Sequence, residues 1–538
     1  MTKLYYNGQI ITMTHKTEKE EREFSPEAVL VVDDKIADVG NKTLLENSVS
    51  HIDEYIDLNG KCLMPAFIDS HSHFVMNGEM MLRVNLSDCE SFEEIVQNLK
   101  NYLEENHITE NQAIIGFGYD QNFLKELNHP DKSVLDQVSS TIPILVLHVS
   151  LHLACANSAA LNLAGINSNT PNPPGGLIGR MGDTPEPSGY LEEIAAGLVQ
   201  EKIIPYCLSD INIVIDKMQD IYLQNGITTV QDGVTSASDL ALLKKLADNK
   251  LLKLDIVSYP LLSADGKHLV DTNPILTRGY HNRLRIGGYK LILDGSPQGR
   301  SAWMSEPYLG EEKDYCGYPY MSNSEVEKYV LQAINEKKQI LVHCNGDAAS
   351  EQYLNAYEKA LEKSNNAEDL RPVMIHCQTV RNDQLDRMKK INMIASIFVG
   401  HVWYWGDVHV KNFGVKRGHH ISPAADALKR GLHVTFHQDT PVTKPDMLHS
   451  VWCAVNRISK SGQILGAEQR IDVYSALRAV TIEGAYQYNE EKTKGIIEKG
   501  KCADLIILDK SPLAIDPIQI KDIVVLETIK SGIRVYKH

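Results

Sequence analysis

The sequence predicts a mixed α/β protein built around a closed, TIM-like (β/α)8 barrel. It also predicts a large insertion after the first barrel strand and a small β-sandwich domain made from both termini. Three observations predict this architecture. Apolar strands alternate with amphipathic helical patterns through the middle of the chain, eight such strands can be counted, and both ends contain short strand-like runs. With 538 residues and 43% hydrophobic residues, the chain can bury a large core without disulfides.

Residues 1–62 and 485–538 are predicted to form one composite β domain. Asn7-Gly8 separates two strand-like runs near the N-terminus and predicts a β-hairpin, and the turn Asp33-Asp34-Lys35 predicts a second hairpin. The C-terminal end has the same character, with runs at Leu505–Leu508, Ile523–Leu526 and Ile533–Tyr536. Because both ends are β-rich and the middle is α/β, we expect the two ends to assemble into one small β unit.

Residues 63–80 and 210–484 are predicted to form the barrel. Between several of its strands lie helical patterns, such as Ser324–Lys337 with apolar residues at helical spacing. The eight expected strands are Leu63–Asp69, Thr228–Asp232, Leu254–Pro260, Tyr289–Asp294, Ile340–Cys344, Val373–Cys377, Ile394–Val399 and His433–Asp439. More than 150 residues separate the first two strands, which is too long for a connection. Residues 81–209 are therefore predicted to form an inserted subdomain over the barrel mouth.

Composition excludes several classes of protein. The formal net charge of −16 argues against nucleic acid or an anionic membrane surface as the main partner. No apolar run approaches the ~18–20 residues of a membrane span, and the first residues do not resemble a secretory signal. The nine cysteines form no CxxC pair. We expect a cytoplasmic enzyme with reduced thiols and a small-molecule substrate; a homodimer fits this fold class, although no dimer surface is evident.

Metal-ligand residue types stand at the ends of four predicted strands. His71 and His73 follow strand one, His343 and His376 end strands five and six, and Asp439 ends strand eight. Because the carboxyl ends of barrel strands meet at one mouth, these side chains are expected to converge, and imidazole with carboxylate suits Zn²⁺. A single histidine at a strand end is more often a hydrogen-bonded structural group. The joint placement on an independently counted set of strands favours a metal site.

Lys290, in strand four, allows two interpretations. A free lysine is protonated at neutral pH and is a poor ligand. Burial beside metal ions lowers the pKa, and the neutral amine can then take up CO₂ to form a carbamate whose two oxygens bridge two cations. The alternative is an ordinary solvated or ion-paired lysine, and the residue pattern alone does not decide between them.

The segment Met64–His73 resembles the metal-binding first strand of the amidohydrolase superfamily. The superfamily order of HxH, Lys, His, His and Asp on strands one, four, five, six and eight is matched by His71 and His73, Lys290, His343, His376 and Asp439. Further segments resemble the branch that contains N-substituted formamide deformylase and uncharacterised metal-dependent amidohydrolases. They are Asn157–Leu161, Gly175–Arg180, Ser188–Glu193, Asp294–Ser296, Asp439–Val442 and Gly500–Leu505.

The resemblance implies that these six residues bind one or two divalent ions, commonly zinc, with Lys290 carboxylated as the bridge. The chain also departs from the branch, which often has a small residue and then Ser before the strand-eight Asp. Here His437-Gln438 precede Asp439, so His437 is expected to contact substrate or to add a ligand. Near strand seven, Trp405 is either a wall of the substrate pocket or part of the packing of a long loop.

The expected activity is hydrolysis of a non-peptide C–N bond in an N-substituted amide or formamide. The metal lowers the pKa of bound water toward ~7, and Asp439 is the expected general acid/base. His152, Arg180 and Glu193 of the insertion are candidates for substrate binding, with lid-anchoring or surface roles as the alternative. The competing hypotheses are a mononuclear-metal deaminase of a small heterocycle and a catalytically silent ligand-binding barrel.

Overall fold

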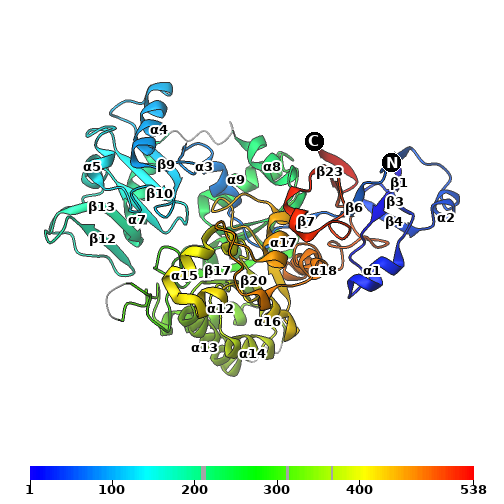
Figure 1. The fold of residues 1–538 in the computed structure, drawn as a ribbon. Coiled ribbons are helices and arrows are strands. Elements are labelled where there is room, and N and C mark those ends of the chain that lie inside the picture. Colours follow the sequence, from blue (N-terminus) through cyan, green and yellow to red (C-terminus); the bar gives the residue numbers. More distant parts are fainter. Residues whose placement is uncertain (208–213, 311–313, 365–367) are drawn as a thin grey trace. The chain divides into compact units, whose positions relative to one another are not determined.

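The computed structural model describes residues 1–207, 214–310, 314–364 and 368–538 (Figure 1). The predicted boundary at residues 209 and 210 lies outside these described residues. The chain forms two compact units. The first unit consists of Met1–Val75, Gln219–Ile292 and Asn323–His538, and the second consists of Met76–Met218 and Leu293–Ser322.

The centre of the first unit consists of parallel strands in two sheets. All eight predicted barrel strands overlap strands of these sheets. One sheet has the order β16-β15-β14-β7, and the other has the order β17-β18-β19-β20-β21. Their bounds are β7 (Phe67–Ile68), β14 (Ile227–Thr235), β15 (Asp255–Pro260), β16 (Leu284–Ile286), β17 (Gly288–Ile292), β18 (Gln339–Cys344), β19 (Val373–His376), β20 (Ile394–Ile397) and β21 (Val434–Phe436).

Backbone contacts also join the two sheets to each other. Leu261, just after β15, forms an isolated parallel bridge with Lys290 of β17. At the other edge, the Asp439 amide donates to the His71 carbonyl (3.2 Å) and the His73 amide donates to the Thr440 carbonyl (2.9 Å). These bonds bring the ends of β7 and β21 together, while closure into a single eight-stranded barrel stays a prediction.

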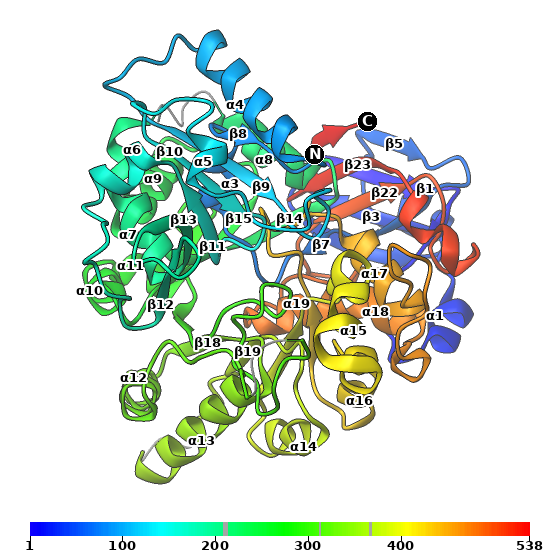
Figure 2. The same cartoon turned by 60° about the vertical axis from the view of Figure 1, so that its left-hand side comes forward.

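Helices follow most of the parallel strands and pack against them. The helical pattern predicted for Ser324–Lys337 is confirmed as α12 (Asn323–Asn335), which buries Val326, Val330 and Ile334. Together with α13 (Asp347–Lys363), α12 packs against β18 (Figure 2). The alternation of apolar strands with amphipathic helices is therefore observed as predicted.

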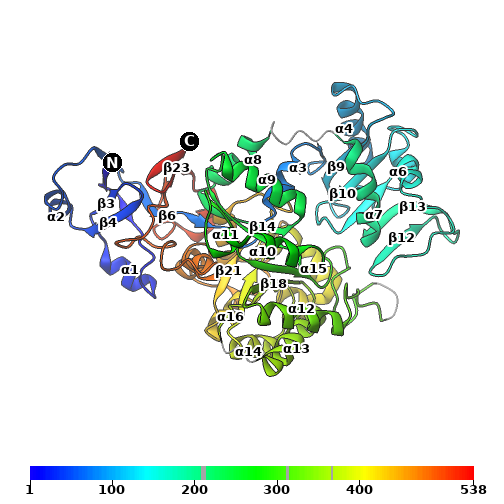
Figure 3. The same cartoon turned by 180° about the vertical axis from the view of Figure 1, so that it is seen from behind.

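Strands from both chain ends share one sheet of the first unit (Figure 3). Its order is β2-β6-β22-β23-β24, with β2 (Gln9–Ile10) and β6 (Cys62–Pro65) from the N-terminal region and β22 (Leu505–Leu508), β23 (Val525–Lys530) and β24 (Ile533–Lys537) from the C-terminal region. A second sheet, β4-β3-β1-β5, comes from the N-terminal region: β1 (Thr2–Tyr6), β3 (Ala28–Val32), β4 (Lys35–Gly40) and β5 (Glu54–Asp57).

The predicted hairpin at Asn7-Gly8 is wrong, whereas the one at Asp33-Asp34-Lys35 is confirmed. β1 pairs with β3 and β5, and β2 pairs with β6 in the other sheet. Gly8 passes so close to Leu58 and the Lys61 carbonyl that a Cβ would lie 2.4 Å from that oxygen. The turn therefore carries the chain from one sheet to the next, because long-range partners for both strands replace the local pairing.

The second unit contains a six-stranded mixed sheet with the order β12-β13-β11-β10-β9-β8. Its strands are β8 (Val84–Asn85), β9 (Ile114–Tyr119), β10 (Ile144–His148), β11 (Leu153–Ala156), β12 (Gly176–Arg180) and β13 (Pro187–Glu193). The helices α4 (Phe92–Glu105), α6 (Ser158–Leu163) and α7 (Ile194–Ile203) pack against this sheet and bury apolar residues such as Leu99, Leu161 and Val199. The unit therefore has a core of its own.

The nine cysteines are all free thiols, and Cys344 and Cys377 are buried. Among the described helices, none combines the length and the apolar character that a membrane crossing requires.

Candidate metal centre

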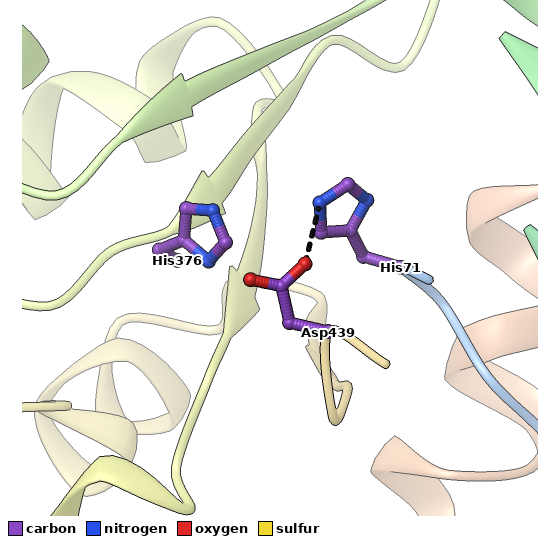
Figure 4. Close-up of side chains that lie close together, drawn as sticks. All are labelled: His71, His376 and Asp439. Atoms are coloured by element: carbon purple, nitrogen blue, oxygen red, sulfur yellow. Dashed lines mark ion pairs between the residues drawn. The ribbon is translucent and has the colours of Figure 1, made fainter. Parts of the chain in front are cut away.

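Histidine and aspartate side chains converge at the carboxyl ends of the parallel strands in the first unit. His71 follows β7, His376 is the last residue of β19, and Asp439 follows β21. Among the described residues, these three form a group whose ligand atoms all lie within 4.8 Å of one another (Figure 4). All three are buried, so a cation between them would be largely shielded from water.

The carboxylate of Asp439 lies between the two imidazoles of the HxH motif. Its Oδ1 is 3.3 Å from His71 Nε2 and 3.2 Å from His73 Nε2. The same Oδ1 is buried and makes no hydrogen bond of acceptable geometry. Burial raises the pKa of Asp439, but the neighbouring imidazoles, His73 first, lower it more, and the net direction is well below its ordinary value. The carboxylate is therefore an anion aimed at ring nitrogens.

The opposite nitrogens of these two rings show which tautomer each adopts. Gln231 of β14 donates its amide to the Ser70 carbonyl (2.9 Å), so its Oε1 faces His71 Nδ1 at 2.5 Å as an acceptor. His73 Nδ1 likewise lies 2.9 Å from the carbonyl of Gly233. Both Nδ1 atoms therefore carry a proton, and in the neutral form of each ring the lone pair lies on the Nε2 atom beside Asp439.

Gly233 is itself needed for this packing. A Cβ at this position would lie 3.0 Å from His71 Cε1, closer than side chains normally approach. The glycine thus lets β14 approach the ring of His71 while its carbonyl orients His73.

A second pair of imidazoles lies on β18 and β19. His343 Nδ1 is 3.0 Å from His376 Nε2, and Asn345 Nδ2 is 3.0 Å from His343 Nε2. Burial lowers the pKa of His376 well below its ordinary value, and the neighbouring imidazole of His343 lowers it further. The ring is therefore neutral, which is the form that binds a metal ion.

The backbone is strained at two of the candidate ligands. His376 has a φ of 78° and Asp439 has a φ of 55°, a region that residues other than glycine rarely adopt. Such conformations cost about 1–3 kcal/mol each and cluster at functional sites. Both residues belong to the group whose ligand atoms lie within 4.8 Å of one another.

Lys290 of β17 belongs to the same cluster. Its side chain is buried, and Nζ lies 3.3 Å from His71 Nε2. Burial lowers the pKa of Lys290 to about 7, although Asp439 raises it. A substantial fraction of the amine is thus neutral near pH 7.

The donor set fits a divalent metal ion. The Nε2 atoms of His71 and His73 and the unbonded Oδ1 of Asp439 face one another at 3.2–3.3 Å, and in the neutral rings these nitrogens carry lone pairs. Acceptors in such contact repel one another unless a cation lies between them, and imidazole with carboxylate is the set that zinc and similar ions prefer. His343 and His376 supply further nitrogen donors near the ends of β18 and β19, and Lys290 supplies one from the middle of β17.

The three predicted substrate-binding residues of the insertion lie in the second unit. His152 Nδ1 is 2.9 Å from Glu193 Oε2 and 3.1 Å from the hydroxyl of Tyr320. Glu193 is buried, its Oε1 makes no hydrogen bond, and its backbone has a φ of 53°. Arg180 instead donates to the carbonyls of Thr170 and Pro185, which ties a local loop together.

The other two predicted substrate-binding residues lie in the first unit and are fully buried. Trp405, in α15 (His401–His419), packs against Phe398 and His401, with ring centroids 6.2 and 4.6 Å away. His437 has 0% exposure and contacts His376 and Ser396. Neither side chain reaches solvent in the first unit.

The residues that orient the ligands do not stand out in the sequence. Gln231, Gly233, Asn345 and Ser396 all contact a candidate ligand or His437. The predicted strand Thr228–Asp232 is itself mostly polar, so no local signal set Gln231 apart.

Comparisons with known proteins agree with this geometry. The model of the amidohydrolase family matches residues 54–536. YtcJ of Bacillus subtilis (strain 168), an amidohydrolase by name, is 27% identical over 556 residues that span both chains fully. N-substituted formamide deformylase of Arthrobacter pascens is 27% identical over 529 residues, which cover 95% of each chain. The crystal structure of an uncharacterised metal-dependent hydrolase from Pyrococcus horikoshii OT3 is 25% identical, covers 96% of this chain and 99% of its own, and has a TM-score of 0.75.

Proposed function

The chain belongs to the amidohydrolase family, and from this premise we propose that it hydrolyses the C–N bond of an N-substituted amide or formamide. The observation that carries the proposal is the buried convergence of the HxH imidazoles on the unbonded Oδ1 of Asp439. The full-length similarity to a formamide deformylase supports the choice of bond.

We further propose that His71, His73, Lys290, His343, His376 and Asp439 hold one or two zinc ions, and that the parallel sheets close into one barrel around them. A bound divalent ion would polarise the substrate carbonyl and lower the pKa of a water molecule. The lowered pKa of Lys290 supports a carboxylated lysine that bridges two ions. A cytoplasmic location and a homodimer stay predictions from the sequence.

Asp439 is the proposed proton carrier. Its Oδ1 is buried and makes no hydrogen bond, so the carboxylate has an oxygen that can accept the proton of the attacking water. As the water oxygen bonds to the carbonyl carbon and the C–N bond breaks, Asp439 returns that proton to the leaving nitrogen. The products are a carboxylic acid and an amine, and no further reactant is needed.

His152 with Glu193 is the proposed pair for holding substrate. The Glu193 carboxylate next to His152 Nδ1 fixes the ring orientation. A ring that is held in this way loses little conformational freedom when it binds a polar group of a ligand.

The experiment is metal content per chain, measured by plasma mass spectrometry on protein purified without chelator and with bicarbonate. We expect two equivalents of metal in the wild-type chain and at most one in Lys290→Ala. The wild-type chain is then assayed for release of amine from a panel of amides and formamides. One equivalent that is unchanged in Lys290→Ala would overturn the bridging lysine and favour deaminase substrates. No bound metal in the wild-type chain would overturn the metal centre.

A further inference from the structure

His437 stands two residues before Asp439, directly after β21, and both of its ring nitrogens are in contact with polar groups. Nε2 lies 3.1 Å from His376 Nδ1, and Nδ1 lies 2.9 Å from Ser396 Oγ. Its ring also packs against Phe398 and the edge of His71, with centroids 5.4 and 5.2 Å away. The imidazole is thus fixed on all sides.

The hydrogen bonds beyond Ser396 show which group donates and which accepts at each contact that leads to His437. Ser70 donates its only hydroxyl proton to the carbonyl of Phe436 (2.9 Å), and a carbonyl can only accept. Ser396, 3.3 Å from Ser70 Oγ, must therefore be the donor in that contact. With its own proton used, Ser396 Oγ accepts from His437 Nδ1.

The same assignment of donors and acceptors extends to the candidate ligand His376. A neutral His437 that donates from Nδ1 has its lone pair on Nε2, which accepts from His376 Nδ1. His376 Nε2 then carries a lone pair, which faces Nδ1 of the second candidate ligand His343 at 3.0 Å. A backbone carbonyl, two hydroxyls and one imidazole thus fix both the tautomer and the rotation of the His376 ring.

This geometry leaves little room for the two roles that the sequence favours for His437. A side chain with 0% exposure and both nitrogens in contact with protein has no free atom for a substrate. As a ligand it would have to break its contact with His376, and His376 would lose the acceptor that orients it.

We propose that His437 is a positioning residue, which presents His376 Nε2 to the metal through the Ser70–Ser396–His437 chain. The proposal rests on the metal centre of the proposed function but not on any substrate. Partners of this kind typically change metal affinity about 10- to 100-fold when they are removed.

The test is zinc affinity of the full-length chain, measured by competition with a chromophoric chelator after removal of bound metal. We compare His437→Leu, His437→Gln and Ser396→Ala with wild type. His433→Gln is the matched control, because His433 borders the same strand, contacts Glu483 near the surface and lies outside the chain of hydrogen bonds. Visible absorption of the Co²⁺-loaded protein is the second readout, because it reports ligand geometry.

We expect His437→Leu to weaken zinc binding about 10- to 100-fold and to change the cobalt spectrum. His437→Gln should restore most of the affinity, because its amide oxygen can accept from His376 Nδ1, and Ser396→Ala should show a smaller loss than His437→Leu. Wild-type affinity and spectrum in both His437→Leu and Ser396→Ala would overturn the proposal while leaving the metal centre intact. A wild-type chain that binds no zinc would instead overturn the proposed function.

Discussion

Asp439 is the residue on which the proposed chemistry depends most directly. It combines a lowered pKa, a left-handed backbone conformation and an oxygen that is buried without a hydrogen bond. Structural carboxylates rarely leave a buried oxygen unbonded, because the loss of hydration is costly. The combination indicates a side chain that is positioned for an ion and a proton.

Asparagine at position 439 separates these two roles. Asp439→Asn keeps one oxygen that can contact the metal but cannot accept a proton, so kcat should fall about 10²- to 10⁴-fold. Metal content per chain, measured on the same preparation, should stay close to that of wild type. Full activity in Asp439→Asn would show that another group carries the proton.

Helices and hairpins could be predicted from the local sequence where the residues that they contact are also close in sequence. The spacing of Val326, Val330 and Ile334 predicts α12, and the Asp33-Asp34-Lys35 turn predicts the β3–β4 hairpin. Asn7-Gly8 fails as a hairpin because β1 and β2 each find better partners far along the chain. Turn sequences specify that the chain reverses or bends but not which strand it will meet.

The end of α17 (Met447–Asn456) depends on a buried arginine. Arg457 caps this helix in the left-handed conformation, and its guanidinium donates to four carbonyls. These belong to Leu465 (2.6 Å), Ser422 (3.0 Å), Ile421 (2.7 Å) and His419 (3.2 Å). Burial lowers the pKa of Arg457 to about 10, so the group remains charged near pH 7.

Arg457→Lys should therefore destabilise the protein although it keeps the charge. A single ammonium cannot reach the four carbonyls at once, and each carbonyl left without a donor costs about 1–3 kcal/mol. The thermal midpoint should fall clearly, whereas the control Arg470→Lys, at an exposed site, should change it little. Equal midpoints for the two variants would contradict this role for Arg457.

Within the first unit, buried ion pairs connect the start of β15 to the C-terminal segment, residues 494–530. Asp255 Oδ2 lies 2.5 Å from Lys494 Nζ and 2.6 Å from Lys530 Nζ, and Lys530 also lies 2.6 Å from Asp504. Burial raises the pKa of Asp255, but Lys494 and then Lys530 lower it more, and the net direction is down. The carboxylate thus links parts of the chain that are far apart in sequence.

Asp255→Asn should cost about 1–3 kcal/mol of stability, because Lys494 and Lys530 lose their shared carboxylate but each keeps another, Glu490 at 2.7 Å and Asp504 at 2.6 Å. The lowered pKa also gives a pH dependence. Above the unfolded-state value of about 4 the full contribution is present, and it is lost as pH falls toward the folded value, because the unfolded chain then binds more protons. Urea unfolding at pH 7 and pH 3 should show a smaller acid-induced loss in Asp255→Asn than in wild type.

Exposed Asp248 provides the control for this comparison, since its pairing with His281 lies at the surface. Asp248→Asn should change stability by less than about 1 kcal/mol at either pH. An Asp255→Asn chain as stable as Asp248→Asn would show that the buried pairs do not hold the C-terminal segment.

By itself, the sequence determined the alternation of strands and helices and which side chains stand at the strand ends. Periodicity is a local property, and the carboxyl ends of parallel strands must meet, so the convergence of His71, His376 and Asp439 could be predicted. Only the tertiary structure decided how each ring is turned. The orientation of His71 depends on Gln231, and that of His376 on His437, 160 and 61 positions away. Hydrogen bonds at such separations leave no periodic pattern, because they depend on which strands lie side by side after folding.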